Sequence, residues 1–148
     1  MGLSRSREAL EMVKRGFAFA VVVDPMAVVA SEVSLPPGCY VGPLAVVRPG
    51  CEVGENTIID GHAFLDHDVL VGAHCHIAPG AVLSGHASVA AGVLVGVGAA
   101  VLPGINVGRG AGVGAGAVVT RHVPDFETAL GGRAQVLVKE RLGGGTPR

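Results

Sequence analysis

His67 and His76 stand out in the sequence because their neighbours and spacing suit proton transfer. His67 lies between two carboxylates in the triplet Asp66-His67-Asp68, and His76 follows nine residues later. Histidine is the side chain whose unperturbed pKa lies closest to neutrality, so a neutral imidazole can accept a proton near pH 7. His67 is therefore a candidate functional residue, and its role depends on the elements that hold it.

A six-residue period runs through most of the chain. Val, Ile and Leu make up only 42 of the 148 residues, yet stepping by six from Val23 meets one of them seventeen times in succession. The probability of such a run by chance is far below about one in a million. The positions are Val23, Val29, Leu35, Val41, Val47, Val53, Ile59, Leu65, Val71, Ile77, Leu83, Val89, Val95, Val101, Val107, Val113 and Val119.

A second ladder of mostly small residues follows the first at a distance of four. The fourth position of the hexads is often Gly, which suits a corner with positive φ. Each hexad is therefore predicted to form a short strand and a turn, with the period unbroken from Val23 to Pro124. The second ladder is Ala27, Val33, Cys39, Ala45, Cys51, Thr57, Ala63, Val69, Cys75, Ala81, Ala87, Val93, Ala99, Ile105, Ala111, Ala117 and Val123.

A single hexad is too short to bury its own aliphatic residue, so hexads must stack on one another. Three hexads per triangular coil place residues 18 apart on top of each other, about 4.8 Å apart. The sequence predicts an all-β protein, a parallel β-helix of between five and six coils. A short N-terminal helix over residues 4–15, capped by Ser4 or Ser6 and ended by Gly16, is expected to form a lid over the open first coil.

Four of the six histidines fit this pattern as corner residues. They occupy the fourth hexad position, where histidine is one of the few residues besides glycine that tolerates positive φ. His67 is third in its hexad and His76 is sixth, so neither is explained as a corner. The four corner histidines are His62, His74, His86 and His122.

Composition and charge exclude several classes of protein. A chain that is 49% hydrophobic with a mean hydropathy of +0.54 folds, and its lack of Trp points to a core of small branched side chains. A net charge of −1 offers no basic field for nucleic acid. The longest apolar run, residues 17–23, is too short to span a membrane, and the first sixteen residues do not form a secretory signal. We expect a cytoplasmic protein.

The cysteines and the end of the chain have structural interpretations. Cys39, Cys51 and Cys75 all fall on the ladder of small residues, so we expect buried thiols without disulfides. The tail from Gly143 is expected to be disordered. The predicted organisation is a helix and lead-in over residues 1–22, the repeats over 23–124, and a C-terminal extension over 125–148.

Residues 58–89, IIDGHAFLDHDVLVGAHCHIAPGAVLSGHASV, resemble the signature stretch of the hexapeptide-repeat acyltransferases of the sialic acid O-acetyltransferase and bacillosamine N-acetyltransferase group. The resemblance implies a left-handed β-helix and an acetyl-CoA-dependent acetyltransferase that modifies the amine or hydroxyl of an amino sugar or a similar small acceptor. The matching elements are Asp66-His67-Asp68, Val71-Gly72, His76-Ile77-Ala78-Pro79-Gly80 and Ser84-Gly85.

The same resemblance implies roles for individual residues. His67 would be the general base and Asp68 the carboxylate that raises its basicity. His76 and the backbone N–H of Gly85 would contact the thioester end of acetyl-CoA, with the pantetheine passing Gly96-Val97-Gly98 toward Asn106. No metal is expected.

The resemblance also implies the partners. They would be an amino sugar or a nucleotide-linked amino sugar, and two further copies of the chain in a homotrimer that forms the CoA site between subunits. The flat, apolar faces expected of the prism also favour a trimer.

Three departures from the family pattern bear on the acceptor. Only 22 residues precede Val23, so the family's nucleotide-sugar-binding domain, and with it the acceptor pocket, is expected to be missing. Asp60 stands where the family has Asn, which adds a third carboxylate near His67 and would favour a cationic acceptor. Arg133 falls in a Gly-Gly-Arg-Ala segment that replaces Gly-x-Pro-Ala, and we expect it to be solvated rather than bound to the CoA phosphates.

Two alternatives remain open from the sequence. A γ-type carbonic anhydrase-like zinc hydratase shares the fold, and His62 and His67 have its five-residue spacing, but Met26 stands where its third ligand should be. A non-catalytic β-helix scaffold that pairs with an acceptor-binding chain is the other alternative.

Overall fold

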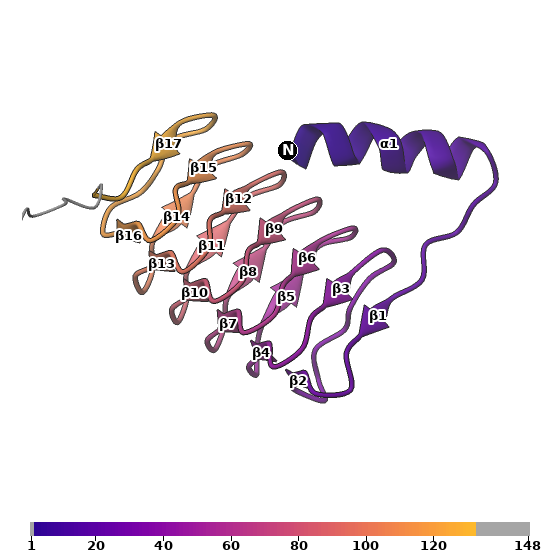
Figure 1. The fold of residues 1–148 in the computed structure, drawn as a ribbon, viewed down its shortest axis with the longest axis horizontal. Coiled ribbons are helices and arrows are strands. Elements are labelled where there is room, and N and C mark those ends of the chain that lie inside the picture. The colour runs from indigo at the N-terminus through magenta and orange to yellow at the C-terminus, as the bar shows by residue number, and fades with distance from the viewer. Residues whose placement is uncertain (1, 133–148) are drawn as a thin grey trace, which may run out of the picture.

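The strands form a parallel β-solenoid of about six turns with one short helix beside it (Figure 1). The computed structural model describes residues 2–132. The predicted all-β hexapeptide-repeat fold is confirmed. The predicted disordered tail from Gly143, and Arg133, lie outside the described residues.

Helix α1 spans Gly2–Lys14, and each of the seventeen strands has two residues. Sheet A holds β1 (Val22–Val23), β3 (Tyr40–Val41), β6 (Ile58–Ile59), β9 (His76–Ile77), β12 (Leu94–Val95), β15 (Gly112–Val113) and β17 (Thr128–Ala129). Sheet B holds β2 (Val28–Val29), β4 (Val46–Val47), β7 (Phe64–Leu65), β10 (Val82–Leu83), β13 (Ala100–Val101) and β16 (Val118–Val119). Sheet C holds β5 (Glu52–Val53), β8 (Leu70–Val71), β11 (Ser88–Val89) and β14 (Asn106–Val107).

The chain passes from sheet A to B to C in each coil, so three columns of turns run along the prism. We call them the A–B, B–C and C–A corners after the sheets that they join. Strands pair in parallel at a spacing of 18 residues, as in Ile58 with His76. Strand amides donate to carbonyls one coil further on, for example Tyr40 N–H to Thr57 O at 3.0 Å, whereas corner amides donate to the preceding coil, as His86 N–H does to His67 O at 3.1 Å. Residues 18 apart therefore stack directly.

The core consists of the two predicted ladders. The aliphatic ladder is buried from Val41 to Val119, and Ile59, Leu65, Ile77 and Leu83 are fully inaccessible. The small residues fill the inside of the corners, where they leave no room for larger side chains. Both predictions are confirmed for these coils.

The three cysteines are buried on the small ladder without disulfides, as predicted. Their thiols point at backbone carbonyls of the next coil, and Cys51 Sγ donates to Asp66 O at 2.9 Å. Burial raises the pKa of the Cys51 thiol, which keeps it protonated as a donor. Cys51 thereby supports the backbone beneath Asp66.

Sheet C lacks a strand in the first coil. The period predicts one at residues 34–35, but Pro36 follows. By the hydrogen-bond register of the solenoid, the amide of residue 36 would donate to the next coil, and proline has no N–H. Sheet C therefore begins at β5.

The predicted unbroken period is wrong at the last coil, which is two residues shorter. Val107 pairs with Val123 and Gly112 with Thr128, a spacing of 16 rather than 18. Val123 therefore lies beside Val107 of the aliphatic ladder. His122 loses the corner position predicted for it: it is absent from the positive-φ residues, and its Nδ1 accepts the Asn106 N–H at 3.0 Å.

The other three histidines are corner residues as predicted. His62, His74 and His86 have φ of 58°, 59° and 59°. Asp68, at the same hexad position, has φ of 57°. Corner geometry thus fixes the direction of the Asp68 side chain.

Helix α1 ends before Gly16, whose φ of +86° stops it as predicted, but the helix is not a lid over the first coil. It lies beside the prism along the C–A corner (Figure 1), where its residues line an apolar pocket of about 710 Å³ with Pro37, Asn56 and His74. The open end of the first coil stays exposed, and its ladder residue Val23 is 42% exposed. Leu10, Val13 and Phe17 line this pocket instead of covering the open end, and each is more than half exposed.

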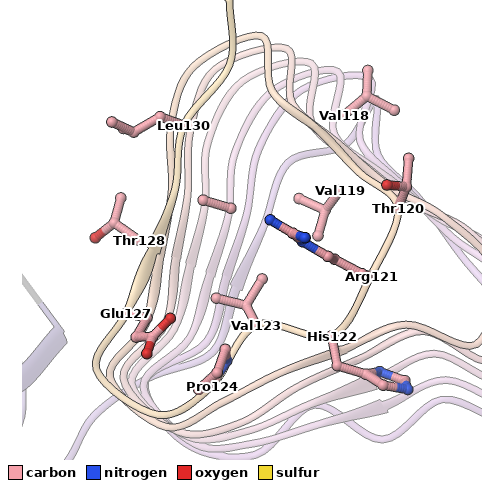
Figure 2. A pocket seen from close by; sticks show the side chains of 11 residues that line it. Val118, Val119, Thr120, Arg121, His122, Val123, Pro124, Glu127, Thr128 and Leu130 are labelled. Carbon is pink, nitrogen blue, oxygen red and sulfur yellow. The ribbon is translucent and has the colours of Figure 1, made fainter.

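The C-terminal end of the described prism is also open. Figure 2 looks into a cavity of about 420 Å³ there, where Val119 and Val123 point inward and Arg121 lies across the opening. This cavity is the unfilled end of the core and holds none of the predicted site residues. Within the described residues, no helix has the length and apolar character that a bilayer crossing requires.

Replacing a buried ladder residue is expected to destabilise the whole solenoid. Leu83→Ala removes a fully buried side chain from the middle coil, so its free energy of unfolding should fall by about 2–5 kcal/mol. Leu70→Ala is the control, because Leu70 is 47% exposed on the outer face of sheet C. Chemical denaturation followed by circular dichroism measures both, and equal losses would contradict the assigned core.

Candidate active site

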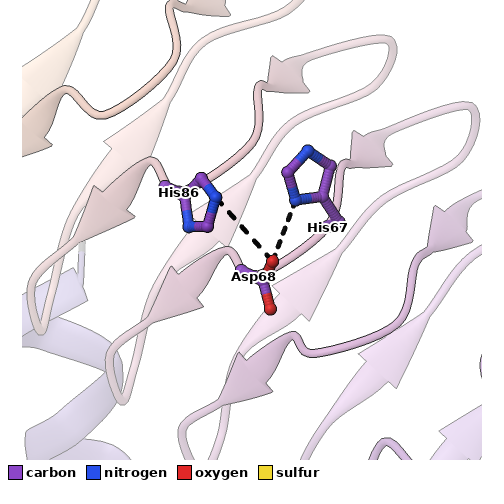
Figure 3. Close-up of side chains that lie close together, drawn as sticks. All are labelled: His67, Asp68 and His86. Carbon is purple, nitrogen blue, oxygen red and sulfur yellow. Dashed lines mark hydrogen bonds and ion pairs between the residues drawn. The ribbon is translucent and has the colours of Figure 1, made fainter.

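The B–C corner brings together His67, Asp68 and His86 (Figure 3). His67 Nδ1 lies 2.9 Å from Asp68 Oδ2, and both side chains are about half exposed, at 46% and 51%. The hydrogen bond assigns the proton to Nδ1, so Nε2 keeps its lone pair. The predicted pairing of His67 with Asp68 is thus present in the structure.

Asp66 does not contact the His67 ring. Its Oδ1 accepts the His67 backbone N–H at 2.8 Å and pairs with Arg48 Nη1 at 2.6 Å. The His67 N–H, and then Arg48, hold the pKa of the Asp66 carboxyl below its ordinary value. Asp66 therefore fixes the turn, and Asp68 is the carboxylate that orients the ring.

Gly85 lies next to the His67 ring because residues 67 and 85 are 18 apart. A Cβ on Gly85 would stand 2.6 Å from His67 Nε2, so only glycine leaves space for the ring in this position. Among the described hydrogen bonds, the Gly85 N–H has no acceptor, whereas Ser84 N–H and His86 N–H both have one. A base nitrogen and an unused backbone donor therefore adjoin each other.

His76 lies on the outer face of sheet A, which is opposite the B–C corner in the same chain. It pairs in register with Ile58 and Leu94, and its Nε2 is 3.5 Å from Asp60 Oδ2. That nitrogen is buried and has no hydrogen-bond partner among the described residues. Within one chain, His76 and Asp60 therefore lie apart from His67.

Val97 and Asn106 lie in two further places. Val97 is 56% exposed at the A–B corner, next to Gly98, which stacks between Gly80 and Gly116; a Cβ on any of these three glycines would meet no atom within 4 Å. This leaves a bare strip along that corner. Asn106 is on the outer face of sheet C, where its Oδ1 accepts a hydrogen bond from Ser88 Oγ at 2.8 Å.

The histidine pair of the zinc hydratase pattern is not brought together. His62 belongs to the A–B corner and His67 to the B–C corner, so a metal held by both would need two chains. The residue that does join His67 is His86, which sequence analysis assigned only to a corner. The sequence could have predicted this contact, because His86 is 18 residues after Asp68 and therefore stacks on it in the next coil.

Comparison with known proteins agrees with the fold. Residues 50–85 match the family described as bacterial transferase hexapeptide (six repeats). These residues include His67, Asp68 and Gly85. No curated protein sequence gave a significant match.

Three solved structures illustrate the likeness. A histidine-to-asparagine mutant of perosamine N-acetyltransferase from Caulobacter crescentus, in complex with CoA and GDP-perosamine, is 37% identical over 88% of this chain with a TM-score of 0.82. The acetyltransferase domain of PglB from Neisseria gonorrhoeae, in complex with acetyl coenzyme A, is 33% identical over 92% of the chain with a TM-score of 0.85. WeeI from Acinetobacter baumannii is 26% identical over 92%, with a TM-score of 0.84.

The repeats, the solenoid and these matches place the chain in the bacterial hexapeptide-repeat transferase family. Within that family it resembles the perosamine N-acetyltransferase of Caulobacter and the PglB acetyltransferase domain. The chain spans 63% of the length of the first and 66% of the second.

Gly85→Ala is expected to displace the His67 ring without unfolding the protein. The new methyl group would meet only the far end of an exposed imidazole, which can rotate away. Gly72→Ala is the contrasting variant, since its Cβ would stand 2.5 Å from the Ala91 backbone nitrogen and must strain the coil. Crystal structures and melting temperatures of both check this; an unmoved His67 ring in Gly85→Ala would contradict the assigned contact.

Proposed function

We propose that the protein is an acetyl-CoA-dependent acetyltransferase that modifies the amine, or a hydroxyl, of an amino sugar or a similar small acceptor. His67 is the general base. The observation that carries the proposal is the arrangement of His67 Nε2, oriented by Asp68 at 2.9 Å, beside the unused N–H of Gly85. The repeats of residues 23–124 carry the activity, with residues 1–22 and 125–148 flanking them.

The chemistry requires one base and one donor at this corner. The acceptor nitrogen or oxygen attacks the thioester carbonyl carbon and gives its proton to His67 Nε2. The charge that develops on the carbonyl oxygen is stabilised by the Gly85 N–H. The C–S bond then breaks, and CoA leaves as the thiol with the proton from Nε2. Asp68 stabilises the imidazolium that exists between these steps.

The donor site is proposed to lie between subunits. His76 lies on the opposite side of the prism from His67, so both reach one thioester only if sheet A of one chain faces the B–C corner of another. The bare A–B corner at Val97 would provide a track for the pantetheine. Asn106 lies on sheet C, opposite that corner, so it would contact the pantetheine from another chain. This arrangement requires an oligomer.

The outer face of sheet B is suited to such contacts. Its six outward residues are all apolar, whereas sheet C presents polar residues beside Leu70. Val28 and Val118 at its ends are 61% and 63% exposed, an apolar stripe that a monomer would leave in water. The stripe runs between the His67 corner and the Val97 corner. Its members are Val28, Val46, Phe64, Val82, Ala100 and Val118.

The acceptor is proposed to be an amino sugar or a nucleotide-linked amino sugar. The perosamine N-acetyltransferase structure contains GDP-perosamine, and this chain spans 63% of that protein. Asp60, which faces His76 at 3.5 Å, adds negative charge where a cationic amine would approach a shared site. The cytoplasmic location stays a prediction.

His67→Ala is expected to lower kcat by roughly 10²- to 10⁴-fold, the usual worth of a general base, with little change in acetyl-CoA affinity or melting temperature. Asp68→Asn should cost less, because it weakens the base without removing it. Thiol release from acetyl-CoA is measured with amino sugars, nucleotide-linked amino sugars and aminoglycosides, and mass spectrometry identifies the product. His76→Ala should instead raise the KM for acetyl-CoA.

His62→Asn is the matched control for these variants. His62 is an exposed histidine at another corner, and asparagine tolerates its φ of 58°. It should retain wild-type kcat. If His67→Ala also keeps most of its activity, the assignment of the base is wrong.

A trimer is expected in solution, with a mass of about 44 kDa from three chains of 14.8 kDa. Phe64→Glu places a charge in the middle of the sheet B stripe and should dissociate the trimer. Leu70→Glu, on sheet C, should leave the trimer intact. Light scattering coupled to size exclusion measures the mass. A wild-type monomer at micromolar concentration would rule out the shared site.

A further inference from the structure

His86 lies at the B–C corner but has no part in the proton transfer proposed for His67. Its Nε2 lies 3.9 Å from Asp68 Oδ2, the same oxygen that contacts His67 Nδ1 at 2.9 Å (Figure 3). The two imidazoles are nearly perpendicular, at 86°, with ring centroids 5.0 Å apart. Two ring nitrogens and one carboxylate oxygen thus converge, all within 4.8 Å of one another.

We propose that His67, Asp68 and His86 form a labile site for a divalent transition metal of the zinc class. Zinc binds imidazole nitrogen and carboxylate oxygen at about 2.0–2.2 Å, which puts tetrahedral ligand atoms about 3.3 Å apart. The observed separations of 2.9 and 3.9 Å bracket that value. The exposed His67 and His86 rings reach it through small rotations.

The charges around the corner favour a cation at this point. Arg48 is engaged with Asp66, at 2.6 Å, so that pair is neutral as a unit. Asp68 pairs with no arginine or lysine among the described ion pairs and contributes a full negative charge. The site has two neutral imidazoles and one carboxylate, the donor set of many two-histidine, one-carboxylate metal sites.

The corner also leaves room for the remaining ligands of the metal. His86 has 68% of its side chain exposed, and the next residue of the column, Gly104, has no atom within 4 Å of the position where its Cβ would stand. Water can therefore complete the coordination shell. Such an exposed, three-ligand site exchanges its metal with solution, unlike the closed sites that hold structural zinc.

Metal binding would switch off the proposed base, and this part of the inference rests on the proposed function. A metal on His67 Nδ1 requires the ring proton to move to Nε2. Nε2–H has no lone pair and cannot accept a proton from the acceptor. Asp68, now a ligand, no longer stabilises an imidazolium. Zinc would therefore inhibit acetyl transfer reversibly.

Binding is tested on tag-free protein without CoA, by competition for Zn²⁺ with a chromophoric chelator. We expect one zinc per chain, with the affinity weakened roughly tenfold or more in His86→Asn and in Asp68→Asn. His62→Asn is the matched control, since it removes an exposed corner histidine with nearly the same φ, and it should bind zinc as the wild type does. Circular dichroism verifies that each variant is folded.

Absence of zinc binding, or equal affinity in His86→Asn and wild type, would overturn the site. Inhibition is measured separately as acetyl transfer in the presence of Zn²⁺, with recovery on adding EDTA. Zinc that binds with the expected ligand dependence but leaves transfer unaffected would overturn the inhibitory role. A protein that transfers no acetyl group at all would overturn the proposed function, while the chelator competition would still decide the metal site.

Discussion

The stacking of residues 18 apart is the constraint on which the rest of the structure depends. Two-residue strands form no stable sheet alone, so their amides must bond to carbonyls of the neighbouring coil. That requirement fixes the hexad register, the aliphatic interior and the narrow corners. It also builds the candidate site, because Gly85 lies above His67 and His86 above Asp68 only when the register is kept. A single inserted residue in the turn after Leu65 would separate these groups.

The sequence predicted the fold well because each hexad repeats the same physical demand. The ladders through Val41 to Val119 and the corners at His62, His74 and His86 follow from periodicity and from tolerance of positive φ. Two errors have local causes that periodicity cannot show. Pro36 removes an amide that a first strand of sheet C needs, and the turn after Val119 is shortened, which turns His122 into a side-chain acceptor for the Asn106 N–H.

The site was predicted less completely, since contacts between coils depend on side-chain direction. The triplet around His67 identified the base candidate and Asp68, but only the structure shows that Asp66 turns toward Arg48 and the backbone. The lid role of α1 was wrong because the helix lies beside the C–A corner, where its residues line a pocket away from the open first coil. His86 was in register with Asp68 and was still missed, because a corner role already explained it.

One chain holds only half of the proposed centre. In the proposal, the His67 corner would supply a base and a backbone donor, and the face that carries His76 and Asp60 lies on the other side of the prism. The apolar stripe of sheet B between the His67 and Val97 corners explains how assembly could join them: burying that stripe brings another chain to the edge of the site. Under this proposal, catalysis and association depend on the same contacts, and the bare strip at Val97 would become a groove when a neighbouring chain covers it.

Complementation between two defective chains tests this account most directly. His67→Ala and His76→Ala subunits are refolded together in equal amounts, and acetyl transfer is measured at subsaturating acetyl-CoA beside each variant alone. If each site takes His67 from one chain and His76 from its neighbour, random mixing restores about a quarter of the sites, with activity well above either parent. Mixed trimers no more active than the average of the two parents would contradict a centre shared between subunits.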